Sequence, residues 1–230
     1  MADEKSQLEK TAENPDLLSL FTLTRCLDGI FWSLLTFYVI LISTFRDLIF
    51  SSFPFLVCLP LFVICLVSFK IPGDFLSVPE WRKNIQMMKV FSLVAAFNFP
   101  FIIFLVRGSS SSHFSICSIV AIYSTMRVLN GVVLTTKSLG GYYQEESLVK
   151  ESRMASIFLY LSISVAIAYL YMVTARPAFL ANVLNNQSVG VIIKVSMLIV
   201  IIFPLLLPVT LLFRIKTIIS IKTKNKLRKF

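Results

Sequence analysis

Six long runs of apolar residues dominate the sequence, and they constrain the fold more than any other feature. Each run is close to the roughly 20 residues that a helix needs to cross about 30 Å of hydrocarbon. Hydrophobic residues make up 57% of the chain and charged residues only 15%, whereas soluble domains have about 45 to 50% and about 25%. The sequence therefore predicts an all-α fold, a polytopic membrane bundle of six transmembrane helices. The predicted spans are residues 27–45, 48–69, 87–106, 114–134, 154–175 and 189–213.

The distribution of lysine and arginine predicts how the chain is threaded. If both termini are cytoplasmic, only Arg46, Arg107 and Arg176 fall in outside loops, and most of the 22 lysines and arginines fall inside. Loops rich in these residues stay on the cytoplasmic side. Five or seven helices would break this alternation, so we expect six helices with both termini in the cytoplasm.

Three shorter segments flank the predicted spans. Residues 1–13 are polar and charged, and we expect them to be disordered. Residues 14–26 combine a capping residue with apolar positions, which predicts an interfacial lead-in helix before the first span. Residues 214–230 carry positive and no negative side chains, and they are predicted to form a basic cytoplasmic tail.

Two of the inside loops contain signals for helix ends. The motif SVPE has a serine, Ser77, three residues before Glu80, which is a capping box and predicts a helix that starts before the bilayer. Trp81 follows directly and suits the membrane interface. In the next inside loop, the glycine pair at 140–141 predicts a helix break.

One arginine lies inside an apolar run. The stretch IYSTMRVLNGVV places Arg127 and Asn130 in the fourth span, with Arg127 about 10 Å from its inner end at about 1.5 Å per residue. Ionisable groups in a span are costly and mark candidate sites. Asp28, at the inner end of the first span, is the only acid at a comparable depth, so we predict an Arg127–Asp28 interaction. With Asn98 these residues form the candidate intramembrane polar site. The alternative is an arginine that reaches the inner headgroups or forms a purely structural ion pair.

Prolines within the predicted spans are a second signal. A proline in a helix interior removes a backbone donor, frees a carbonyl group and permits a kink. In membranes, broken helices often line binding sites, although proline kinks also occur where helices simply pack. The candidate kinks are Pro54, Pro60, Pro100, Pro204 and Pro208.

The basic tail is a third signal. Cations directly after a span bind anionic headgroups, each contributing roughly 1 kcal/mol near the surface. Ribosomal RNA is a less favoured polyanion for this segment, we expect no DNA partner, and simple retention of the tail inside is the alternative. The candidate anionic-lipid contacts are Lys216, Lys222, Lys224, Lys226, Arg228 and Lys229.

Motifs for catalysis are missing from the sequence. It contains no H-E-x-x-H, no phosphate-binding glycine loop and no G-x-S-x-G. Its four cysteines form no C-x-x-C pair and it has one histidine, so neither a disulfide framework nor a zinc site is predicted. We expect no catalytic residue, no cofactor and no metal, in a protein that is not an enzyme.

Two functions fit these expectations. The first is a non-enzymatic membrane subunit of a transport or permease system, with a polar site in the cytoplasmic half of the bundle and a partner ATPase; it is based on overall layout alone. The second is a scaffold, assembly factor or insertase-like helper that binds other membrane proteins or lipid. The first predicts a polar cavity near Arg127, and the second a dry bundle or a groove open to lipid. The sequence shows no sorting feature, which favours a bacterial inner membrane over the endoplasmic reticulum.

Overall fold

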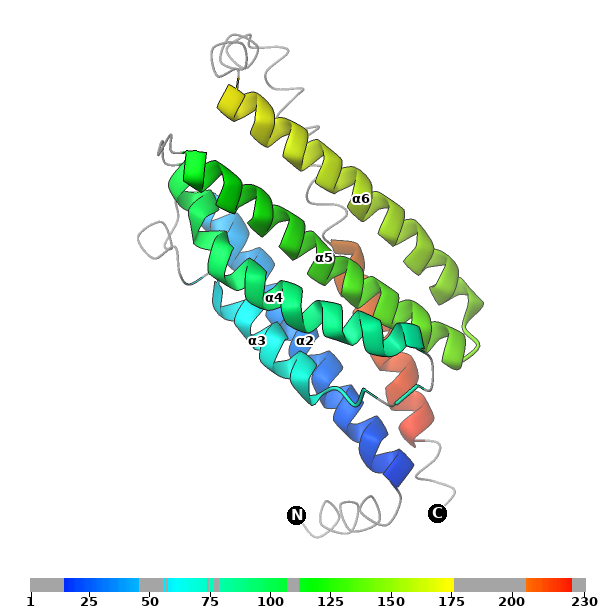
Figure 1. Ribbon diagram of the computed structural model, residues 1–230. Helices are drawn as coiled ribbons and strands as arrows, with labels where there is room; N and C mark the ends of the chain where they lie inside the picture. The colour runs from blue at the N-terminus through cyan, green and yellow to red at the C-terminus, as the bar shows by residue number, and fades with distance from the viewer. Residues whose placement is uncertain are drawn as a thin grey trace.

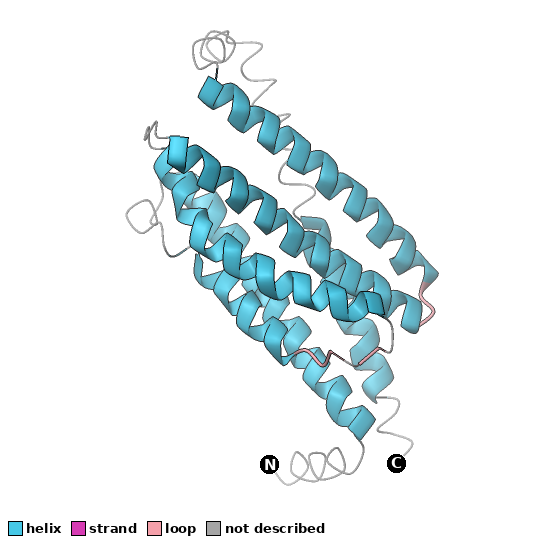
Figure 2. Cartoon of the chain, viewed as in Figure 1, coloured by secondary structure: helices cyan, strands magenta, loops and turns pink. Residues whose placement is uncertain are grey.

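The structure of the protein is a computed structural model, and every regular element in the part of the chain that it describes is a helix (Figures 1 and 2). The described residues are 15–45, 56, 58–73, 75–76, 79–106, 112–175 and 206–224. The helices are α2 (Pro15–Phe45), α3 (Cys58–Lys70), α4 (Pro79–Val106), α5 (Ser112–Tyr142) and α6 (Glu146–Ala175). A further helix over residues 206–224 is named here the C-terminal helix.

Helices that follow one another in the chain pack side by side, so that α2, α3, α4, α5 and α6 form a series of neighbours. The pair α4 and α5 makes the most extensive contact, and α6 runs along the flank of α5 (Figure 1). The C-terminal helix joins the two ends of the series, because Phe213 contacts Phe31 of α2 and Arg214 pairs with Glu151 of α6. The start of α2 and the end of the C-terminal helix lie at the same end of the bundle (Figure 1).

Four described helices are long and apolar enough to cross a membrane, so the chain is a helical bundle of the membrane type. The fifth apolar helix, α3, is shorter. Much of the second predicted span and most of the sixth lie outside the described residues. The predicted all-α membrane bundle is therefore confirmed, whereas six spans and cytoplasmic termini stay predictions. The four helices contain the segments Leu18–Ile40, Pro79–Ile102, Ser112–Tyr142 and Glu146–Ala168.

The inner and outer faces of α2 show why this bundle belongs in a membrane. Apolar residues recur every three or four positions and form one buried stripe that includes Leu27, Leu34 and Phe37. The opposite face is also apolar, and Trp32 on it is 59% exposed. A helix that is apolar on all sides is buried in a large core or surrounded by lipid. Since this face is uncovered, the pattern fits lipid.

Two predicted boundaries change in the structure. Residues 15–26 continue without a break into the first predicted span within α2, and Leu23 is fully buried. They are therefore part of the bundle and continuous with the first span, while the interfacial position of the lead-in helix stays a prediction. Similarly, the predicted tail starts inside the C-terminal helix, where Ile215 and Ile219 are fully buried. Their spacing of four residues gives this helix an apolar stripe despite its lysines.

The loop before α4 agrees with the sequence in one respect, and the structure adds a second feature. The described helix α4 already includes Pro79 and Glu80, well before the predicted span at 87–106, in agreement with a helix that starts ahead of that span. Trp81 is fully buried inside the bundle, and its Nε1–H donates a hydrogen bond to the Pro72 carbonyl at 3.1 Å. The indole thus fixes the loop onto α4, because its polar edge finds a partner inside the protein.

The glycine pair at 140–141 does not break α5, which continues to Tyr142. A Cβ atom on Gly140 would lie 3.3 Å from side-chain atoms of Leu148 and Val149, so the glycine permits close approach of α6. The left-handed turn residue is Gln144, with φ of 60°. The predicted break is therefore shifted to the turn before α6.

The candidate kinks have different positions in the structure. Pro100 lies inside α4 and Pro208 inside the C-terminal helix. Pro60 lies two residues after the start of the described helix α3, and a kink there stays a prediction. Pro54 and Pro204 lie outside the described residues.

Candidate functional site

Close packing of α4 on α5 determines the position of Arg127. A Cβ atom on Gly131 would lie 2.5 Å from Cγ of Met88, so only glycine allows this approach without a shift. Gly131 lies about one turn after Arg127 on the same side of α5. This contact therefore places Arg127 beside the next part of α4.

The guanidinium of Arg127 is surrounded by soft and aromatic groups. Its Nη2–H donates to Sδ of Met87 at 3.1 Å, and its carbon Cζ lies 5.4 Å from the centre of the Phe91 ring. Nη1 is 3.5 Å from the hydroxyl of Tyr160 on α6, and Nε is buried without a hydrogen-bond partner. The cation–π contact is favourable, but a thioether is a weak acceptor. Among the described residues, no carboxylate pairs with Arg127.

Asn130 connects α5 to α6 through a small hydrogen-bond network. Its amide Nδ2–H donates to the Tyr160 hydroxyl at 3.1 Å, and its Oδ1 accepts from the Ser156 hydroxyl at 2.7 Å. Asn130 is 3% exposed, so these bonds satisfy a polar group that would otherwise be costly to bury. Arg127, Asn130, Ser156 and Tyr160 are named here the flank site.

Asp28 lies elsewhere, and the predicted Arg127–Asp28 pair is wrong. Asp28 forms an ion pair with Lys216 of the C-terminal helix, whose ammonium also lies 5.5 Å from the centre of the Phe31 ring. The sequence indicates the depth of a residue along its helix but not which helices are neighbours. The structure makes α2 a neighbour of α3 and the C-terminal helix, while Arg127 faces α4 and α6.

Asn98, the fourth residue of the predicted polar site, makes its hydrogen bond within α4. Its amide donates to the Val94 carbonyl at 2.9 Å. This local bond satisfies the side chain without a partner helix. Of the four predicted residues, the structure brings together only Arg127 and Asn130, and their functional role stays a prediction.

The lysines predicted to contact anionic lipid have several different surroundings. Lys216 is paired with Asp28, and Lys222 donates to the Tyr143 carbonyl at 3.2 Å with its ammonium 4.9 Å from the Tyr143 ring centre. Burial, together with the neighbouring Tyr142, raises the pKa of Tyr143 to about 12, so the ring beside Lys222 stays neutral at physiological pH. Lys224 is exposed at the end of the helix. Lys226, Arg228 and Lys229 lie outside the described residues, and the lipid contact stays a prediction.

Sequence reasoning missed the aromatic, sulfur and hydroxyl partners of the flank site. Ser156 and Tyr160 are four residues apart and therefore share a face of α6, and Arg127 and Asn130 are likewise three apart. Two polar pairs at helical spacing in adjacent spans are a usable signal for a polar contact between helices. The ring of Phe91 and the thioether of Met87 carry no such signal, because both residues are ordinary in a span.

The flank site differs chemically from the centre of the bundle. Residues from α2, α3, α4, α5, α6 and the C-terminal helix form one buried apolar cluster, with Leu34, Ile64 and Val133 among its fully buried members. Tyr160, in contrast, is 47% exposed. The arrangement offers a cation and two hydroxyl groups at the side of the bundle. No protein-family model, no curated protein and no solved structure matches the chain, so the functional argument depends on this geometry.

Proposed function

We propose that the protein is a membrane-embedded interaction protein that binds a membrane helix of a partner protein, with Arg127 receiving an acidic side chain of that helix. The single observation that carries the proposal is a cation at the flank of the bundle without a described carboxylate partner. Of the two functions expected from the sequence, this is the scaffold or helper.

The energetics of a half-buried cation in a span support the proposal. An arginine at the centre of a span costs about 2.5 to 3.5 kcal/mol on insertion scales, and less near the interface. The Phe91 ring, the Met87 sulfur and the Tyr160 hydroxyl offset part of this cost, but none of them carries a negative charge. A carboxylate brought to Arg127 would therefore be bound strongly, because the surrounding dielectric is low.

The outward face of α6 suits a second helix. Ile157 and Leu161 are both 56% exposed, and Ser164 and Ala168 are exposed on the same face of α6. Small residues four apart let helices approach closely in membranes, where packing replaces the hydrophobic effect as the main attraction. A partner helix along this face would pass directly beside Tyr160 and Arg127.

The apolar interior favours this function over transport. A transport subunit needs a polar path through the bundle. For this protein, the transport function predicts a polar cavity near Arg127. Here the buried centre is formed mainly by side chains such as Leu27, Phe37 and Val132, and the polar groups of the flank site lie at its side. Transport is therefore the weaker proposal.

The proposal can be tested with two designed membrane helices that differ in a single side chain. Both are apolar single-span peptides, one with an aspartate and the other with an asparagine, placed at the depth of Arg127. Their association with the full chain is measured in liposomes by energy transfer between fluorophores. We expect the aspartate peptide to bind about tenfold more tightly, the equivalent of about 1.4 kcal/mol.

The variant Arg127→Gln should remove that preference and leave binding of the asparagine peptide unchanged. Lys150→Gln is the matched control, because Lys150 is also on the helical pair α5 and α6 but lies in an exposed pair with Glu146. Equal binding of the two peptides to the unmodified protein, or a preference for aspartate that survives in Arg127→Gln, would contradict the proposed function.

A further inference from the structure

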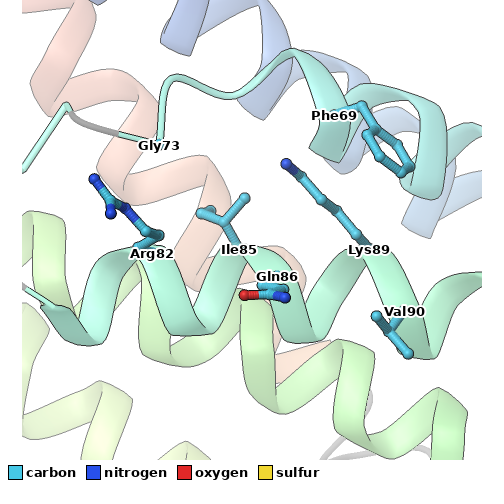
Figure 3. A pocket seen from close by; sticks show the side chains of 7 residues that line it. All are labelled: Phe69, Gly73, Arg82, Ile85, Gln86, Lys89 and Val90. Carbon is cyan, nitrogen blue, oxygen red and sulfur yellow. The ribbon is translucent and has the colours of Figure 1, made fainter.

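A cleft of about 330 Å³ lies between the end of α3, the loop that follows it and the first turns of α4. Figure 3 shows Arg82 and Lys89 projecting from α4 toward this loop, with Phe69 above Lys89 on α3. Ile85 is 2% exposed and forms the floor, whereas Phe69 and Val90 are 65% and 52% exposed at the rim. The cleft is therefore open to the surroundings of the bundle.

The exposed apolar side chains of the lining gather at one end of the cleft. Arg82 and Lys89 are seven residues apart, about two turns, so they lie on one face of α4 about 10 Å apart along its axis. Gln86 lies between them, and Phe69 and Val90 border the end at Lys89. The lining contains two cations and no acidic residue.

The ammonium of Lys89 is suitably placed to bind an anion. It lies 5.0 Å from the centre of the Phe69 ring, a cation–π contact that leaves its donors available for further bonds. Among the described residues, no carboxylate forms an ion pair with it. A lysine on this apolar helix therefore has a positive charge that is not compensated within the described bundle.

The position of the cleft along the bundle matches the edge of a membrane. It lies at the end where α3 meets the loop before α4, the same end that holds the start of α2 and the end of the C-terminal helix (Figure 1). Its apolar end points toward the middle of the bundle, since residue numbers on α4 increase in that direction. Headgroups and the first acyl carbons of a lipid are arranged in this same order.

We propose that this cleft binds the headgroup phosphate of an anionic phospholipid. Lys89 and Arg82 provide the positive charge, and the amide of Gln86 donates to a phosphate or glycerol oxygen. The acyl chain lies against Phe69 and Val90. The exposed apolar rim is the reason to favour a lipid over free phosphate, which needs only the cations. Arg127 of the flank site contacts Met87 and Phe91, which lie on a different face of α4 from the cleft residues. Each proposal can therefore be tested independently of the other.

The test uses the purified full chain in nanodiscs that contain phosphatidylglycerol diluted in phosphatidylcholine. Lipid retained after transfer to detergent is measured by native mass spectrometry. We expect selective retention of phosphatidylglycerol, and a loss of about 20- to 30-fold in its affinity in the double variant Arg82→Gln with Lys89→Gln, at roughly 1 kcal/mol per cation. The single variant Lys89→Arg keeps the charge and should retain most of the affinity for phosphatidylglycerol.

The matched control is Lys83→Gln with Lys150→Gln, which removes the same charge from exposed lysines outside the cleft. Equal losses in the control and in the cleft variant would show a general surface effect and overturn the proposal, as would unchanged retention in the cleft variant. Phe69→Ala separates the two sources of phosphate. This variant should weaken lipid retention. If instead it has no effect and inorganic phosphate competes fully with the lipid, the ligand is free phosphate and not a lipid.

Discussion

The two sides of α5 differ in how they hold their neighbours. Toward α4 the contact is close and mainly apolar, with Met88 against Gly131. Toward α6 the contact combines buried apolar residues such as Leu159 with the hydrogen bonds of Asn130 to two hydroxyl groups, and α6 leaves large side chains such as Leu161 exposed. The α4–α5 contact is therefore close and apolar, whereas the α5–α6 contact includes polar groups and leaves Tyr160 about half exposed at the surface.

The largest expected effect comes from the apolar side. Gly131→Ala places a Cβ atom 2.5 Å from Cγ of Met88, and overpacking of this kind costs about 1 to 3 kcal/mol. Thermal or denaturant unfolding of the full chain in micelles should show this loss. Gly141→Ala is the control, because nothing lies within 4 Å of its Cβ position, and the loss of a helical glycine there is neutral or stabilising by up to about 1 kcal/mol.

A double-mutant cycle sharpens the result. Met88→Ala removes the atoms that clash, so the free-energy changes of Gly131→Ala and Met88→Ala should not add. Additive changes would mean that the contact between Gly131 and Met88 does not determine how α4 packs on α5.

The next effect comes from the polar side. Asn130→Ala removes the hydrogen bonds to Tyr160 and Ser156, and such bonds between membrane helices contribute on average about 0.6 kcal/mol each. We expect a stability loss of about 1 kcal/mol and greater separation of α5 from α6 in spin-label distance measurements. Asn98→Ala is the control and should change stability by less than about 0.5 kcal/mol, because Asn98 bonds only to Val94 of its own helix.

A smaller effect is expected where the C-terminal helix meets α2. The side chains of Lys216 and Asp28 are 28% and 38% exposed, and partly exposed pairs contribute about 0 to 1 kcal/mol. A cycle of Lys216→Gln and Asp28→Asn should give a coupling energy of about 0.5 kcal/mol that falls as salt is added. The pair Lys150–Glu146, with both side chains more than three-quarters exposed, should give a coupling near zero. Equal coupling energies in the two pairs would show that the Lys216–Asp28 pair has no structural role.

The smallest stability effect is expected at Arg127. Arg127→Gln removes the contacts with Phe91 and Met87 but also removes a charge that no described carboxylate compensates. Since these effects oppose each other, the free energy of unfolding should change by less than about 0.5 kcal/mol. The same variant should abolish the preference for an acidic peptide. A large loss of stability would instead make Arg127 a structural residue of the bundle.

Much of the fold follows from the sequence, because hydrocarbon imposes a length and an apolar composition that can be read directly. The extension of α4 ahead of the predicted span 87–106 was predictable from its capping motif. The full extent of the C-terminal helix was not, because its lysines indicate a tail, and its buried Ile215 and Ile219 are recognisable only with the neighbouring helices in place.

The candidate site was predictable only in part. Arg127 and Asn130 stand out because polar residues are costly in a span. Their partners depend on which helices are neighbours and on how each helix is rotated, and a single sequence indicates neither. Asp28 was therefore predicted at a suitable depth but beside the wrong helix, and Tyr160 was overlooked among the aromatic residues of its span.

The central claim is that the flank site faces lipid at the side of a dry bundle. It is tested most directly by spin labels attached at Leu161 and at Lys150 in a variant without native cysteines, with collision rates measured for oxygen and for a water-soluble nickel chelate. Leu161 is beside Tyr160 on the exposed face of α6, and Lys150 is exposed near the start of that helix. We predict that the label at Leu161 collides mainly with oxygen and the label at Lys150 mainly with the chelate. Equal access of the chelate to both positions would reveal a water-filled passage beside Arg127 and contradict the account.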